Sequence, residues 1–185
     1  AIDRFQLQRA TATGSGIIIA IIDTGIASHS DLNANVVAGY DFISDGTVAN
    51  DGGGRDADPS DPGDWTSGQC GSARGSSWHG THVAGIAAGD GSQSGGCHGA
   101  YRYIGVATEA DLIVVRLWGT TTGDANKPPT PNRLMIDAVR YVLNQARLAG
   151  KPVAINLSIG NFSERQDGAT ADCVAIQPPV SAMTM

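Results

Sequence analysis

The chain has 185 residues, of which 41 % are hydrophobic and 16 % charged, a composition typical of one globular domain and not of a disordered chain. Eighteen acidic residues against 12 basic ones leave a net charge of −6, which argues against a nucleic-acid-binding surface. The sequence contains no apolar run of about 18 residues, so it predicts no membrane-spanning helix.

Three continuous apolar segments predict buried parallel strands, and they occupy residues 16–23, 112–117 and 153–157. Small apolar residues over 79–89 predict a helix that packs closely on a sheet. Residues 41–78 are rich in Gly, Asp, Ser and Pro, which predicts a long loop of the kind that is usually functional.

Residues 131–149 form the clearest predicted helix. Thr130 can cap its start, Pro131 suits its first position, and Gly150 ends it. Five apolar residues recur at helical spacing and predict one buried face: Met135, Val139, Val142, Leu143 and Ala146. Strands alternating with helices predict an α/β fold with a mostly parallel sheet.

The first candidate functional motif is Ile22-Asp23-Thr24-Gly25, directly after the first apolar strand. An Asp there lies at the carboxyl end of its strand, the edge where α/β sheets build their sites. Two other interpretations stay open. Asp23 could cap a turn, or it could serve an aspartic protease, which would require a dimer because the chain carries one such motif.

The second motif is His79-Gly-Thr-His-Val-Ala-Gly85, at the start of the predicted helix. An imidazole at this position can face a cleft, so His79 is a candidate catalytic residue. A zinc site is disfavoured because the spacing to His82 is three, not four, and no Glu accompanies the pair. We interpret His82 as a structural histidine that is hydrogen-bonded inside the protein.

These motifs, together with Asn156-Leu-Ser-Ile-Gly160 after the third strand, resemble in order the segments of the subtilisin-like serine proteases, or subtilases. His29-Ser-Asp-Leu32 is similar to the family's His-Pro-Asp-Leu, and the loop from Arg55 to Trp65 looks like the secreted bacterial branch. The resemblance implies a three-layer α/β fold, with helices on both faces of the sheet, that is incomplete at its C-terminal end. It implies that residues 1–162 are the N-terminal portion of a catalytic domain, followed by an unassigned tail over 163–185.

The resemblance also implies roles for individual residues. His79 would be the general base towards a serine hydroxyl, and Asp23 would orient and stabilise its imidazole. An extended polypeptide substrate would add as a β-strand between two stretches of backbone. These stretches are Arg116, Leu117, Trp118 and Gly119 on one side and Ser158, Ile159 and Gly160 on the other. The implied enzyme is a secreted serine endopeptidase with no nucleic-acid or membrane partner.

The chain departs from the family at the nucleophile, because it contains no Gly-Thr-Ser-Met-Ala segment. Ser181 is the nearest look-alike, but it lacks the flanking glycine. We therefore expect the chain to be a fragment whose partner is a missing C-terminal segment that carries the serine. The alternative is a non-catalytic peptide-binding module on the same fold.

The acidic loop suggests a structural calcium ion, since clustered carboxylates repel one another unless a hard cation binds them. Four candidate ligands are in this loop: Asp56, Asp58, Asp61 and Asp64. Asp31 resembles a separate calcium ligand of the family. A solvated acidic loop without metal is the alternative.

Three cysteines are present, and an odd number leaves one without a partner inside the chain. Cys70 and Cys97 flank the His79 motif in two predicted loops, and we predict a disulfide between them. Cys173 would pair with a cysteine beyond residue 185 or remain a buried thiol.

Overall fold

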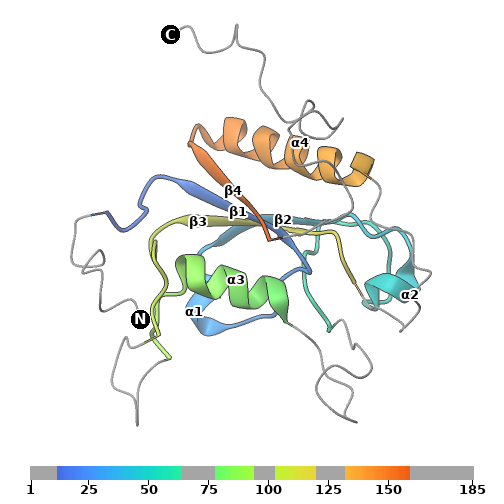
Figure 1. Ribbon diagram of the computed structural model, residues 1–185, viewed down its shortest axis with the longest axis horizontal. Coiled ribbons are helices and arrows are strands. Elements are labelled where there is room, and N and C mark those ends of the chain that lie inside the picture. Colours follow the sequence, from blue (N-terminus) through green and yellow to red (C-terminus); the bar gives the residue numbers. More distant parts are fainter. Residues whose placement is uncertain (1–11, 64–77, 94–102, 120–131, 159–185) are drawn as a thin grey trace, which may run out of the picture.

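The computed structural model describes residues 12–63, 78–93, 103–119 and 132–158. Their strands form one sheet in the order β2-β3-β1-β4, in which every neighbouring pair is parallel (Figure 1). The strands are β1 (Ile18–Asp23), β2 (Val36–Asp41), β3 (Asp111–Arg116) and β4 (Val153–Leu157).

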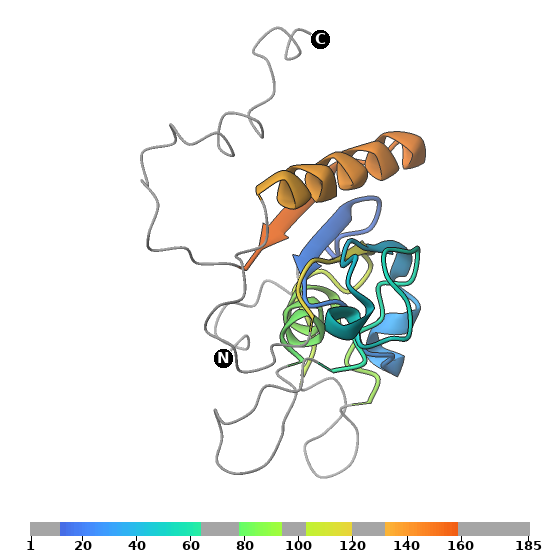
Figure 2. The same ribbon diagram turned by 90° about the vertical axis from the view of Figure 1, so that its right-hand side faces the viewer.

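Helices cover both faces of this sheet. The long helix α4 (Asn132–Ala149) lies on one face, and α3 (His79–Ala88) lies with the short α1 (Ser30–Asn33) on the other, as two perpendicular views show (Figures 1 and 2). A further short helix, α2 (Gly46–Ala49), follows β2. The three-layer α/β architecture predicted from the sequence is therefore confirmed.

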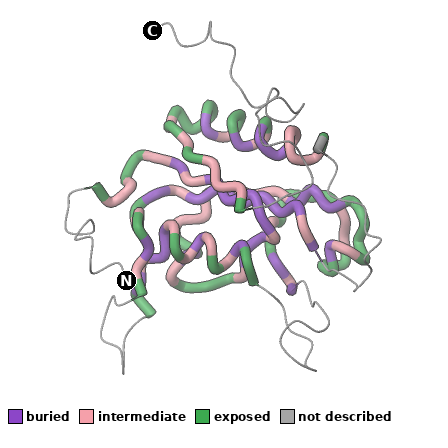
Figure 3. The backbone as a smooth tube through the Cα atoms, viewed as in Figure 1, coloured by how far each residue is buried: buried purple, intermediate pink, exposed green. Residues whose placement is uncertain are grey.

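Strand β1 is the centre of the hydrophobic core, and its residues are buried along nearly its whole length (Figure 3). Ile18 and Ile22 contact the layer of α4, whereas Ile21 packs with residues of α3 and α1. A strand buried on both faces needs apolar side chains at successive positions, which is why its sequence shows no alternation.

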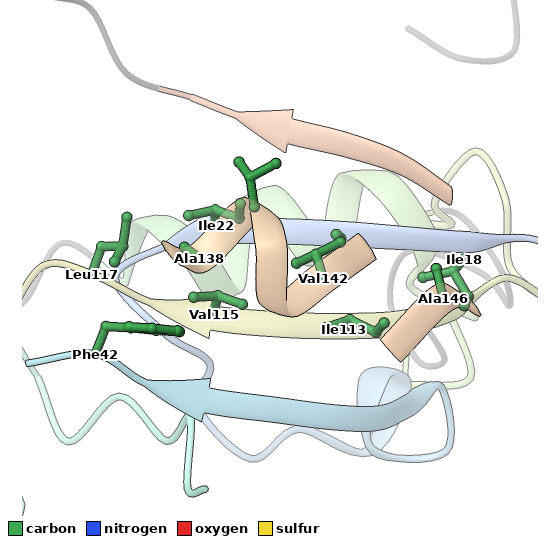
Figure 4. Packing of buried hydrophobic residues seen from close by; sticks show 11 residues of the cluster. Ile18, Ile22, Phe42, Ile113, Val115, Leu117, Ala138, Val142 and Ala146 are labelled. Atoms are coloured by element: carbon green, nitrogen blue, oxygen red, sulfur yellow. The ribbon is translucent and has the colours of Figure 1, made fainter. Parts of the chain in front are cut away.

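Helix α4 packs one apolar stripe on the sheet, through Ala138, Val139, Val142 and Ala146 (Figure 4). Leu143, predicted to share this face, is 47 % exposed, so that prediction is wrong. It follows Val142 by one residue and is therefore turned about 100° away from Val142 around the helix axis, towards the edge of the stripe. None of the helices described here is long and apolar enough to cross a membrane.

The helix ends where its sequence indicates. Gly150 adopts a left-handed conformation, with φ of +64°, and its N–H donates to the carbonyl of Arg147. This confirms Gly150 as the residue that ends α4.

Strand β2 and helix α1 were not predicted. In the part of the sheet that the structure describes, β2 pairs with β3 alone and most of its residues are only partly buried, so its apolar signal is weak. Gly39 also lies within the strand, where Pro59 packs so closely that a Cβ atom would be 2.2 Å from its ring. The described part of the predicted loop, residues 41–63, is anchored by backbone hydrogen bonds between Asp41 and Asp56.

Candidate active site

The carboxyl edge of the sheet gathers charged side chains from three neighbouring strands. β1 ends at Asp23, β2 at Asp41 and β3 at Arg116, and the strand register places Arg116 opposite both carboxylates. Parallel strands bring their carboxyl ends to the same edge, so residues far apart in the sequence meet there.

His79 is the first residue of α3, and its ring faces Asp23 across this edge. The His79 Nδ1 atom lies 2.8 Å from Asp23 Oδ1 and 2.9 Å from Oδ2, although 56 residues separate the two in sequence. Asp23 is 2 % exposed, whereas the His79 side chain is 48 % exposed. The pair therefore joins a buried carboxylate to an imidazole that solvent can reach.

This arrangement suits proton transfer. A buried carboxylate accepts hydrogen bonds, so the His79 Nδ1–H group donates to Asp23 and Nε2 is the nitrogen that can take a proton from another molecule. The backbone N–H of Thr24 also donates to Asp23 Oδ1, at 2.7 Å, and fixes the direction of the carboxylate. The Asp23–His79 contact thus has the geometry of the carboxylate–imidazole half of a Ser-His-Asp triad.

Close packing of two backbone segments brings this pair together. A Cβ atom on Gly80 would lie 2.3 Å from the carbonyl oxygen of Gly25 and 3.2 Å from Asp23 Oδ1. Gly25 itself has φ of +99°, a conformation that favours glycine. The first turn of α3 therefore rests directly on the turn after β1, and this contact requires a residue without a side chain.

A matched pair of substitutions in α3 tests this packing. Gly80→Ala is expected to lower the free energy of unfolding by about 1–3 kcal/mol, because the new methyl group overlaps a backbone oxygen. Gly85→Ala, where no atom lies within 4 Å of the new group, is expected to stabilise the helix by about 0.5–1 kcal/mol. Urea denaturation measures both changes. Equal stability of the two variants would contradict the close contact at Gly80.

Arg116 is fully buried and forms the centre of a second charged cluster. Its Nη1 atom lies 2.8 Å from Asp41 Oδ2 and 2.9 Å from Asp51 Oδ2, and its Nη2 donates to the carbonyl of Ala49. Burial raises the pKa of Asp41 to about 6, against the lowering effects of the Ile43 N–H group and of Arg116. The cluster joins the ends of β2 and β3 to helix α2.

These contacts correct part of the predicted peptide-binding backbone. The carbonyl of Arg116 accepts from Phe42 N–H, and the N–H of Leu117 donates to the carbonyl of Asp23, so both groups are already bonded. Strand β3 is internal, with a partner on each side, and its end offers no open edge at these groups. Gly119 packs against Val48, whose carbonyl oxygen would lie 2.0 Å from an added Cβ.

The remaining described members of the predicted binding set are Trp118 and Ser158. Trp118 packs partly buried against the core beneath α4. Ser158 is exposed directly after β4, and its hydroxyl accepts from the side chain of Asn156 at 2.8 Å. Of these residues, Ser158 is the one whose exposure suits contact with a substrate.

Four of the acidic residues predicted to bind calcium lie among the described residues: Asp56, Asp58 and Asp61 of the acidic loop, and the separate Asp31. Asp56, Asp58 and Asp61 each accept from a backbone N–H two residues later, an arrangement that stabilises turns. Asp31 accepts from Ser92 and Gln93. Among the described residues, no three His, Cys, Asp or Glu side chains could hold a metal ion. Asp64 lies outside the described residues, so the calcium ion stays a prediction.

The structure also bears on the prediction for His82, whereas some other predicted residues lie outside the described ranges. His82 is exposed, so its interpretation as an internal histidine is wrong, because the face of α3 on which it lies points to solvent. Several predicted residues lie outside the described ranges: Asp64, Cys70, Cys97, Ile159, Gly160, Cys173 and Ser181. Their roles stay predictions.

The contacts that support the Asp23–His79 pair were not predicted from the sequence. The Thr24 hydroxyl accepts from the N–H of Gly80 at 3.0 Å and donates to Asp61 Oδ2 at 3.2 Å. Thr24 follows Asp23 and Gly80 follows His79 in the sequence, and this adjacency to the predicted catalytic residues is the signal that could have identified them. Nothing in the sequence alone shows that Asp61 is 4 % exposed.

Comparison with known proteins agrees with this geometry. Residues 14–183 match the sequence pattern that describes the subtilase family. An extracellular protease of Xanthomonas campestris is 51 % identical over 116 residues, which are 60 % of this chain and 19 % of that protein. An extracellular basic protease of Dichelobacter nodosus is 41 % identical over 119 residues, again 60 % of this chain and 19 % of the relative.

A solved structure of a protease from Pseudoalteromonas arctica superposes with a TM-score of 0.50 and 36 % identity, covering 80 % of this chain and 51 % of that one. The chain thus spans about a fifth of the length of the two curated relatives and half of the solved structure. The match over residues 14–183, the three-layer α/β fold and the paired Asp23 and His79 together show that this chain belongs to the subtilase family.

Proposed function

We propose that the protein is a secreted serine endopeptidase in which His79 is the general base and Asp23 orients it. The observation that carries this proposal is the contact between His79 Nδ1 and both oxygens of the buried Asp23. In this mechanism Nε2 takes the proton of a serine hydroxyl as the hydroxyl attacks the peptide carbonyl, and returns it to the leaving amine. Secretion is supported by the two relatives named as extracellular proteases.

The nucleophile belongs to a part of the protein outside these 185 residues, since no Gly-Thr-Ser-Met-Ala segment occurs among them. The substrate is a polypeptide that binds in extended form beside Ser158, which is exposed directly after β4. Because strand-like binding uses backbone hydrogen bonds, such a site accepts many sequences.

A fluorophosphonate probe, which reacts with activated serines, tests this function. The full-length protein is expected to be labelled, and peptide mapping is expected to place the label on a serine followed by Met-Ala. The His79→Ala variant is the control, and labelling should fall below detection on the same time scale because the base is gone.

The alternative function is a non-catalytic module that binds peptides on the same fold, which the missing serine segment favours. An unlabelled full-length protein that is folded and still binds unstructured polypeptide would contradict the endopeptidase and support the module. Inhibition by a pepstatin-type ligand, with no fluorophosphonate labelling, would instead indicate the aspartic-protease interpretation of Asp23.

A further inference from the structure

We propose that Asp61 is a positioning residue for the Asp23–His79 pair and acts through the hydroxyl group of Thr24. This inference rests on the proposed proteolytic function, in which that pair transfers a proton. Asp61 comes from the acidic loop, yet its side chain is directed inward and is only 4 % exposed. Its Oδ1 accepts from the N–H of Gly63 at 2.8 Å, and its Oδ2 accepts from Thr24 Oγ1 at 3.2 Å.

Thr24 connects Asp61 to both members of the pair. Its backbone N–H donates to Asp23 Oδ1 at 2.7 Å, and its hydroxyl oxygen accepts from the N–H of Gly80 at 3.0 Å. Gly80 is the residue that follows His79 in the first turn of α3. A single residue therefore holds the carboxylate through its backbone and the helix that carries the imidazole through its side chain.

The hydroxyl of Thr24 replaces the usual cap of this helix. The first N–H groups of a helix have no partner within it and are commonly satisfied by the side chain of the residue before the first turn. Here that residue is Trp78, which has φ of +49° and makes no side-chain capping bond. The cap is instead supplied from the segment after β1, which links the start of α3 to the strand that ends in Asp23.

Asp61 determines the direction of this hydroxyl group. A hydroxyl has one hydrogen to donate and can rotate, so by itself it does not favour one partner. An ionised carboxylate is an acceptor only, and it draws the hydroxyl hydrogen towards itself. The oxygen lone pairs of Thr24 are then directed at the N–H of Gly80.

The backbone holds Asp61 in place independently of its side chain. The N–H of Asp61 donates to the carbonyl of Ile26 at 2.9 Å, and the N–H of Ile26 donates to the carbonyl of Pro59 at 3.0 Å. The loop is thus bonded to the segment just after the Asp23 turn. Removal of the carboxylate should therefore affect the orientation of Thr24 more than the course of the loop.

Two substitutions and their combination test this role in the full-length protein. Asp61→Ala removes the acceptor, and Thr24→Val removes the hydroxyl while keeping the shape of the side chain. Each is expected to lower kcat about 10-fold to 100-fold with little change in KM, the range expected when a catalytic group is displaced by up to about 1 Å. Because both changes break the same connection, the double variant is expected to lose no more than the more damaged single variant.

Asp45→Ala is the matched control. Asp45 is an exposed carboxylate that accepts from the backbone N–H and hydroxyl of Thr47, a comparable turn that contains no contact with Thr24. This variant is expected to keep the kcat of the wild type.

Nuclear magnetic resonance gives a readout that does not depend on turnover. The proton between His79 Nδ1 and Asp23 should resonate far downfield in the wild type, and it should shift or broaden in Asp61→Ala and Thr24→Val but not in Asp45→Ala. An unchanged resonance in both variants, or losses in kcat that multiply in the double variant, would overturn the role of Asp61.

The experiments distinguish a failure of the proposed proteolytic function from a failure of the proposed role of Asp61. If the wild type shows no labelling and no turnover, the proteolytic function is contradicted, while the resonance still tests the connection from Asp61 to the pair. If Asp61→Ala does not fold, the nearly isosteric Thr24→Val carries the test through the same resonance and the same kcat.

Discussion

Replacing Asp23 with Asn is expected to lower kcat of the proposed full-length endopeptidase about 10⁴-fold, the size of effect that this change has in a Ser-His-Asp protease. The carboxylate accepts the Nδ1 hydrogen of His79 through two oxygens at 2.8 and 2.9 Å. An amide offers one acceptor and one donor in that space, and its N–H₂ group favours the imidazole with its hydrogen on Nε2. Nε2 then cannot accept the proton of the nucleophile.

Hydrolysis of a chromogenic peptide substrate by the full-length protein measures this loss. The fold should persist, because the Asn side-chain oxygen can still accept from the N–H of Thr24, which holds the Asp23 carboxylate at 2.7 Å. Asp45→Asn is the control for a carboxylate-to-amide change at an exposed turn and should keep full activity. An Asp23→Asn protein with more than a tenth of the wild-type rate would contradict the assignment of Asp23.

Replacing Arg116 with Met is expected to lower the free energy of unfolding by about 3–5 kcal/mol, the cost of leaving a buried charge without its partner. Arg116 and Asp41 are both completely buried, and Asp51, which also pairs with Arg116, is 20 % exposed. Methionine fills a similar volume but offers no donors. The carboxylate of Asp41 and the carbonyl of Ala49 would then lose the donors that satisfy them.

The loss of stability caused by Arg116→Met should depend on pH, and the pKa of Asp41 determines whether it grows or shrinks as the pH rises. Burial raises this pKa from its ordinary value of 3.8 to about 6, so ionisation of Asp41 costs stability as the pH rises through 6. Without Arg116, ionisation costs more and Asp41 binds its proton up to a higher pH. The destabilisation by Arg116→Met should therefore be larger at pH 8 than at pH 5.

Urea denaturation at the two pH values measures both effects. Arg140→Met is the matched control, since Arg140 is 75 % exposed and lies 3.8 Å from Asp137, and its loss should cost less than about 0.5 kcal/mol. Adding Asp41→Asn to Arg116→Met should restore part of the stability, because the unpaired charge is removed. Equal effects of the substitutions at Arg116 and Arg140 would contradict a buried cluster.

Much of the fold could be predicted because its signals are local. The apolar run that became β1 and the helical spacing of α4 are properties of neighbouring residues, and the structure places both elements within one or two residues of their predicted bounds. Strand β2 escaped prediction because its burial comes largely from one neighbouring strand and its sequence contains Gly39.

The Asp23 and His79 motifs were recognisable for a related reason. Each lies at the end or the start of a regular element, where the direction of a side chain follows from the element itself. The structure brings the two together as the resemblance implied, at the carboxyl edge of the sheet.

The roles of the other charged residues depended on the tertiary structure. Arg116 ends a strand, and its sequence context does not reveal that its side chain turns into the protein to meet Asp41. Asp61 is one acidic residue among several in the same loop, and only the folded loop distinguishes it from its exposed neighbour Asp58.

The sequence by itself determined the order of the main elements, the family resemblance and the two residues of the candidate catalytic pair. The tertiary structure alone decided which acidic residues are buried and what they contact, including the connection from Asp61 through Thr24 to the helix of His79. The physical reason is that hydrophobic periodicity is set by adjacent residues. The burial of a charge and the partner that satisfies it depend instead on segments that meet only after folding.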